Sequence, residues 1–196
     1  MPIYVAKTDR MDITWNLSSG YIFVQQKWKY VWEDESGKNP WTLDEKRDFH
    51  HKVDKWIWEL WSSKAYATIT GNSKLAQEYR NTKFKINVDI RWVIGHENEH
   101  WTVHVRKNNP DSKVIWMRRE IYLDYNTDIK YVGITGFVDS SMKYAQVGAA
   151  HEFGHAFGNT TSAKYTDSIS SNLLHGNEYE EPCLSEYKDD ASIECR

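Results

Sequence analysis

Residues 84–94, FKINVDIRWVI, decide the fold that this sequence predicts. Apolar side chains occupy every second position from Phe84 to Trp92, which is the period of a β-strand with one buried face. The alternation resumes after a polar turn, in residues 101–105 (WTVHV). Two alternating strands joined by a polar turn predict a β-hairpin.

An amphipathic helix is predicted ahead of this hairpin, from Thr42 to about Ser62. Thr42 and Glu45 have the spacing of a capping box, in which the two side chains satisfy backbone N–H groups of the first turn. Residues 21–32, which precede the helix, are rich in aromatic and β-branched residues and predict a strand. Apolar residues recur at helical spacing within the helix, at Phe49, Val53, Trp56 and Leu60.

The second half of the chain predicts more strands and one more helix. Strands are expected over residues 114–125 and 129–138, and a helix from about Ser141 to Phe157. A helix, antiparallel strands and a second helix indicate an α+β fold. We expect a single domain over residues 1–196 with a C-terminal tail from about residue 180.

Both cysteines, Cys183 and Cys195, lie in this tail, with eleven residues between them. In an oxidising compartment a disulfide between them would pin the tail, whereas a reducing cytosol would leave two thiols. The sequence leaves both alternatives open.

Composition excludes several classes of protein. The chain has 196 residues, 40% of them hydrophobic, and ten tryptophans, which is too apolar for a disordered protein. It has no run of about 18 apolar residues, so no membrane span is expected. The net charge of −3 comes from mixed charges without a basic face, so no nucleic-acid partner is expected. We recognise no signal peptide at the start of the chain.

Two segments match the pattern H-E-x-x-H: residues 96–100 (HENEH) and 151–155 (HEFGH). The pattern serves as a zinc site on a helix, where side chains four residues apart share one face. The first match lies between two alternating strands, so we expect a solvated hairpin tip whose side chains point apart. The second lies on the predicted helix. There we expect His151 and His155 to hold one Zn²⁺ per chain, with Glu152 as general base.

The string AAHEFGHAFGN, residues 149–159, resembles the active-site helix of the zincin metallopeptidases, especially bacterial members that carry HEFGH. The string DSISSN, residues 167–172, is similar to a DSIMS-type turn that follows HEFGH in bacterial secreted and effector metallopeptidases, including domains carried by type VI secretion spike proteins. Ser170 occupies the position of the methionine in that turn.

The resemblance implies a zincin-like fold with a twisted, mostly antiparallel sheet, an N-terminal amphipathic helix and an active-site helix. It implies hydrolysis of a protein or peptide substrate, which would pair with an edge strand at residues 131–137. It also implies a bacterial toxin or effector with a secretion-system carrier and a cognate inhibitor. Such a protein would be secreted, or delivered to an extracytoplasmic compartment by a specialised system.

A third zinc ligand must lie further along the chain, because a catalytic zinc usually takes three protein ligands. The extended zincin motif would place a histidine at position 161, where this chain has Thr161. Glu178 is the favoured candidate, since the Asn-Glu pair resembles the third-ligand helix of gluzincins. His175, a good ligand by its chemistry, and Asp167, whose spacing resembles that of aspzincins, are the alternatives.

The alternative function is a zincin-like binding module, or a carbohydrate- or wall-associated module, without catalysis. Trp56, Trp58 and Trp61 crowd one helix, and exposed tryptophans can bind sugars. We favour packing of these rings in the core, because tryptophan is highly buried on average.

Overall fold

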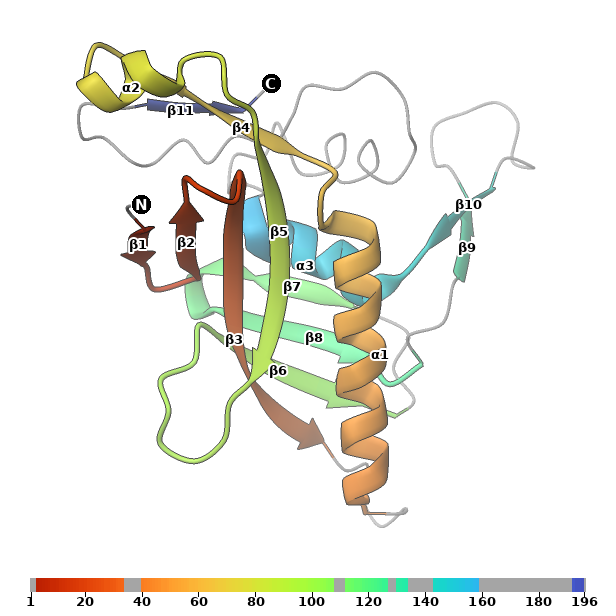
Figure 1. Ribbon diagram of the computed structural model, residues 1–196. Helices are drawn as coiled ribbons and strands as arrows, with labels where there is room; N and C mark the ends of the chain where they lie inside the picture. Colours follow the sequence, from red (N-terminus) through yellow and green to blue (C-terminus); the bar gives the residue numbers. More distant parts are fainter. Residues whose placement is uncertain are drawn as a thin grey trace.

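The computed structural model describes residues 3–33, 40–107, 112–126, 130–133, 143–158 and 192–195. Within this part of the chain, nine strands form one mixed sheet and two short strands form another (Figure 1). The strands of the large sheet are β1 (Ile3–Lys7), β2 (Asp12–Asn16), β3 (Tyr21–Glu33), β4 (Tyr66–Thr70), β5 (Phe84–Trp92), β6 (Trp101–Arg106), β7 (Lys113–Ile115), β8 (Glu120–Asp124) and β11 (Ser192–Cys195). The small sheet and the helices are β9 (Lys130–Gly133), β10 (Lys143–Gln146), α1 (Leu43–Trp61), α2 (Lys74–Tyr79), α3 (Gly148–Gly158) and the 3-10 turn η1 (Trp116–Arg118).

The centre of the large sheet is parallel. Its order is β11-β4-β5-β3-β6-β8-β7, and β3 runs parallel to both β5 and β6, as β6 does to β8. Antiparallel pairs lie at the flanks, where β7 meets β8, β4 meets β5 and β11 meets β4. The β1–β2 hairpin adds antiparallel pairing beside β3. The predicted zincin-like α+β fold with a mostly antiparallel sheet is therefore wrong, since the described chain is mostly β, with a mixed sheet and few helices.

The expected hairpin fails because β5 and β6 each pair with β3 instead of with each other. β3 has 13 residues, so β5 pairs with its first half, up to Trp28, and β6 with its second half, from Trp28 to Glu33. Alternation in sequence reports which side chains are buried, and carries no information on strand direction. Parallel strands usually read as continuous apolar runs, which is why the alternation suggested antiparallel pairing.

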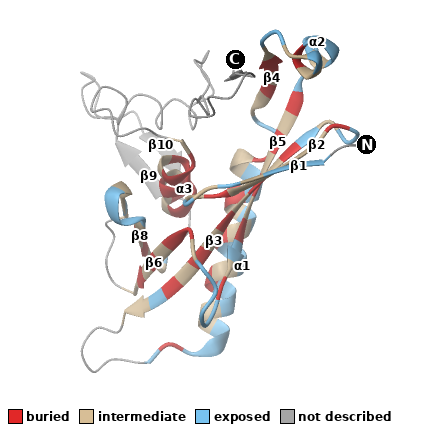
Figure 2. Cartoon of the chain, turned by 90° about the vertical axis from the view of Figure 1, so that its left-hand side faces the viewer, coloured by how far each residue is buried: buried red, intermediate tan, exposed pale blue. Residues whose placement is uncertain are grey.

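Both long helices cover the same face of this sheet. On β3 the ring of Trp28 lies 6.4 Å from that of Phe153 on α3, and the ring of Tyr30 lies 5.9 Å from that of Phe49 on α1. The side chains of Trp28 and Tyr30 point to the same face because they are two residues apart. Figure 2 shows the resulting pattern, with alternating buried positions on β3 and a mostly buried α3.

Helix α1 forms as predicted. The hydroxyl of Thr42 accepts from the backbone N–H of Glu45 (3.2 Å), and the Glu45 carboxylate accepts from that of Thr42 (2.8 Å), so the capping box is confirmed. At the other end, the Ser62 hydroxyl accepts from the Val88 N–H (2.9 Å) and lies 3.2 Å from the Val88 carbonyl. These contacts join the end of α1 to β5. The fully buried residues of the helix are Phe49, Val53 and Ile57.

Several predicted boundaries in the second half are wrong. The segment 114–125 is two strands, because η1 and the left-handed backbone of Arg119 (φ 54°) turn the chain between β7 and β8. The helix expected from Ser141 begins only at Gly148, since residues 143–146 pair with β9 as strand β10. Tertiary pairing thus overrides a modest helix propensity in this segment.

Other expectations fall partly outside the described residues. Of the edge strand expected at 131–137, residues 131–133 lie in β9 and pair with β10, and the remainder is not described. Cys195 lies in β11, opposite Ala67 of β4, whereas Cys183 is not described, so the disulfide stays a prediction. None of the described helices has the length and apolar character needed to cross a bilayer.

A polar contact is buried between α1 and the sheet. The hydroxyl of Tyr30 and Nδ1 of His50 are 3.0 Å apart, and the ring of Trp92 lies 5.7 Å from that of His50. Burial, with a smaller contribution from the neighbouring His51, lowers the pKa of His50 to about 4. The folded protein therefore holds this ring neutral at pH values where an exposed histidine takes up a proton.

We expect His50 to destabilise the fold in mild acid. Between about pH 6.5 and pH 4 the unfolded chain binds a proton that folded His50 does not, so the free energy of unfolding falls as the pH is lowered. The contribution is at most about 1.4 kcal/mol per pH unit. Urea unfolding of wild type and His50→Gln across this range measures it, with substitution of the exposed His96 by Gln as control. Equal slopes for wild type and His50→Gln would contradict the assignment.

Candidate metal centre

Helix α3 brings the two histidines of the second H-E-x-x-H motif together. Its first turn is closed by the bond from the His151 N–H to the carbonyl of Val147 (3.0 Å). The Nε2 atoms of His151 and His155 are 3.1 Å apart, with ring centroids separated by 4.7 Å and planes at 84°. Side chains four apart on a helix meet on one face, so this convergence is a property of the local sequence.

The distance between the two nitrogens fits a shared zinc ion. Zinc binds imidazole nitrogen at about 2.0–2.1 Å, so two such ligands in a near-tetrahedral arrangement lie about 3.3 Å apart. Burial, and then the neighbouring His155, lowers the pKa of His151 to about 4, which favours the neutral ring that binds metals. Nδ1 of His151 is buried and has no hydrogen-bond partner among the described residues.

Glu152, the candidate general base, is also buried. Only 5% of its surface is exposed, and this burial raises the pKa of its carboxyl group to about 8. A divalent cation close by would favour the charged form of the carboxyl and act against this shift. The motif thus combines a pair of converging imidazoles with a desolvated carboxyl group on one helix.

The helix is held in place by two tryptophans. Nε1 of Trp61, the last residue of α1, donates to the carbonyl of Ala150 (2.9 Å), and Nε1 of Trp116 donates to the carbonyl of His155 (3.0 Å). A Cβ atom at Gly154 would lie 2.3 Å from Cζ2 of Trp61. The missing side chain at Gly154, between the two histidines, therefore admits an indole ring.

The third ligand lies outside the described residues, as do all three of its candidates: Glu178, His175 and Asp167. Thr161 and Ser170, the two departures from the resembled motifs, lie there too. Among the residues that are described, no group of three or more His, Cys, Asp or Glu side chains is placed to hold a metal ion.

The first motif, residues 96–100, does not form a pair of imidazoles. His96 is exposed, whereas His100 is buried, and its Nδ1 accepts the backbone N–H of Lys27 on β3 (2.9 Å). His100 therefore anchors the chain where it enters β6, and the expectation of a solvated hairpin tip is wrong for this residue. Burial lowers the pKa of His100, and its Nε2 lies 3.5 Å from Oδ1 of Asp12.

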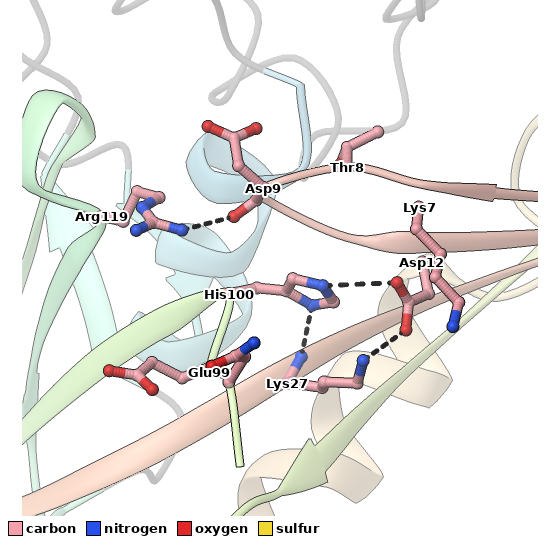
Figure 3. A pocket seen from close by; sticks show the side chains of 9 residues that line it. Lys7, Thr8, Asp9, Asp12, Lys27, Glu99, His100 and Arg119 are labelled. Atoms are coloured by element: carbon pink, nitrogen blue, oxygen red, sulfur yellow. Dashed lines mark hydrogen bonds and ion pairs between the residues drawn. The ribbon is translucent and has the colours of Figure 1, made fainter. Parts of the chain in front are cut away.

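A cavity of about 510 Å³ opens beside His100, between β1, β2 and the start of β6 (Figure 3). The basic and acidic side chains that line the cavity are equal in number. Within it, Lys27 pairs with Asp12 at 2.6 Å, and the guanidinium of Arg119 donates to the carbonyl of Asp9. With the His100 ring neutral, this balance favours neither an anionic nor a cationic ligand. The charged residues that line the cavity are Lys7, Lys27, Arg119, Asp9, Asp12 and Glu99.

The tryptophans of α1 are divided between core and surface. Trp56 and Trp61 are partly buried and pack against the hydrophobic core, as expected. Trp58 is 47% exposed, so its expected packing beneath the sheet is wrong. A single exposed ring on α1 is a poor platform for a sugar.

The sequence did not indicate the role of Trp116, because its contact with His155 joins residues 39 positions apart.

Comparison with protein-family models, with curated proteins and with solved structures finds no match to this chain.

We expect Gly154→Ala to destabilise the protein. The new methyl group would overlap the Trp61 ring, and overpacking of this kind costs about 1–3 kcal/mol, more than the gain of about 1 kcal/mol in helix propensity. Gly148→Ala on the same helix is the control, because its Cβ would meet only the Ser112 hydroxyl, at 3.3 Å. Denaturant unfolding measures both, and equal stability of the two variants would refute the close contact.

Proposed function

We propose that this protein is a zinc-dependent metallopeptidase that hydrolyses peptide bonds in a protein or peptide substrate. The observation that carries the proposal is the 3.1 Å separation of the Nε2 atoms of His151 and His155 on helix α3. Two imidazoles whose Nε2 atoms converge, with a glutamate directly after the first histidine, supply two zinc ligands and the general base that zinc-dependent hydrolysis uses.

Zinc held by these two histidines would supply a water with a pKa near 7. In the proposed mechanism, Glu152 accepts the proton of the attacking water and then delivers it to the leaving amine nitrogen. Burial alone would leave the Glu152 carboxyl protonated at neutral pH, so this role depends on a bound divalent cation, whose charge would favour the carboxylate.

The third ligand is proposed to be Glu178, with His175 and Asp167 as the alternatives. Its resemblance to the third-ligand helix of gluzincins supports Glu178. A bacterial effector role, with a carrier and a cognate inhibitor, stays a prediction that rests on the resemblance of the HEFGH and DSISSN segments.

Strand β7 is the proposed place for the substrate backbone. It is the last strand of the large sheet, pairs only with β8 in the described part of the chain, and packs against α3. An extended peptide can add to such an edge through main-chain hydrogen bonds. β7 is thus an alternative to residues 131–137, of which 131–133 lie in β9 and pair only with β10 in the described part of the chain.

We expect Glu152→Gln to abolish peptide hydrolysis while zinc stays bound. Loss of a general base lowers the rate by about 10²–10⁴-fold, and the amide cannot accept the proton. Cleavage of a mixed peptide library, followed by mass spectrometry, measures the rate, and metal analysis measures the zinc content of each purified variant.

The matched control is Glu97→Gln in the first H-E-x-x-H motif. Glu97 is on the surface and pairs with Arg91 at 2.6 Å, so this variant should cleave at the wild-type rate. Full activity of zinc-loaded Glu152→Gln would remove Glu152 from the mechanism. Glycan binding that survives removal of zinc, without any peptide cleavage, would favour the carbohydrate-binding alternative.

A further inference from the structure

Two indole N–H groups reach helix α3 from different parts of the fold. Trp61 comes from the end of α1 and donates to the carbonyl of Ala150, the residue before the first histidine. Trp116 comes from η1, between β7 and β8, and donates to the carbonyl of His155, the second histidine. Both donors therefore act on the backbone that carries the metal-binding pair.

The Trp61 contact fixes how α3 faces α1. The indole lies directly against Gly154, and its ring centroid is 6.0 Å from that of Phe153 and 6.2 Å from that of Phe157. Trp61 therefore contacts residues 150, 153, 154 and 157, which lie along one face of α3. Rotation of α3 about its axis would break the hydrogen bond and bring the side chain of a neighbouring residue against the ring.

The Trp116 contact acts at the opposite end of the motif. Nε1 of Trp116 donates to the carbonyl of His155 (3.0 Å), in the last turn of α3, which ends at Gly158. The Trp116 ring is itself held, with the Arg10 guanidinium 3.8 Å from its centroid and the Trp101 ring meeting it edge-on at 5.8 Å.

We propose that Trp61 and Trp116 are positioning residues, which set the rotation and the height of α3 so that the two imidazoles converge on one metal ion. This inference rests on the proposed zinc site. One hydrogen bond alone would leave the helix free to pivot, whereas two bonds at residues 150 and 155 define its orientation. Metal sites need this support, because ligand atoms displaced by about 0.5 Å no longer share an ion well.

The test compares Trp61→Phe and Trp116→Phe with Trp41→Phe. Each change keeps an aromatic ring and removes an indole N–H. Trp41 is the matched control, since its indole donates to the carbonyl of Glu33 (3.1 Å) at the opposite end of α1 from Trp61. Zinc affinity is measured by competition with a chelator, and the visible spectrum of the Co²⁺-loaded protein reports the geometry around the metal.

We expect Trp61→Phe and Trp116→Phe each to weaken zinc binding by about tenfold, the lower end of the effect of groups that orient metal ligands. Their Co²⁺ spectra should shift, whereas Trp41→Phe should retain the wild-type affinity and spectrum. If Trp61→Phe does not fold, the half-buried Trp116 decides the question alone.

Wild-type affinity and spectrum in both variants would overturn the positioning role and leave the proposed metallopeptidase intact. Failure of the wild-type protein to bind zinc is a different result, which would overturn the proposed function and this inference together.

Discussion

The close approach of Trp61 to Gly154 is the contact on which the candidate site depends. With no side chain at Gly154, the indole at the end of α1 lies against the backbone of α3, and the two helices share one face of the sheet. Phe153, next along the helix, then reaches Trp28 on β3. The candidate pair of histidines is therefore fixed to the core by the missing side chain at Gly154 as much as by any side chain that is present.

The sequence correctly predicted the elements that depend on contacts between residues close together in the chain. The capping box at Thr42 and the helical spacing of Phe49 and Val53 identified α1, because a helix is closed by contacts three and four residues apart. Strand direction is a different matter. Alternation in β5 and β6 reported a buried face correctly, but their parallel pairing on opposite sides of β3 joins residues far apart in the chain, which alternation does not report.

The two H-E-x-x-H segments show that the same distinction between local and long-range contacts applies to the candidate site. On α3 the spacing alone brings His151 and His155 together, so their convergence could be predicted. In the first segment the same pattern lies in a loop, where Nδ1 of His100 accepts a hydrogen bond from the backbone N–H of Lys27 on β3. The role of Trp116 could not be predicted at all, because its bond to His155 depends on how β7 and β8 pack beneath the helix.

The β7–η1–β8 hairpin links the two halves of the proposed chemistry. Ile115 ends β7, the edge proposed to pair with substrate, and Trp116 directly follows it and holds the carbonyl of His155. Movement of this hairpin along α3 would displace the substrate edge relative to His155 and would also break the Trp116 hydrogen bond, so this bond opposes such movement. A peptide paired with β7 would therefore keep its register relative to the imidazoles, because one short segment of chain positions both. β7 runs antiparallel to β8, which is parallel to β6, so the chain reverses once before β7 and again at η1, and this second reversal places Trp116 directly after the substrate edge.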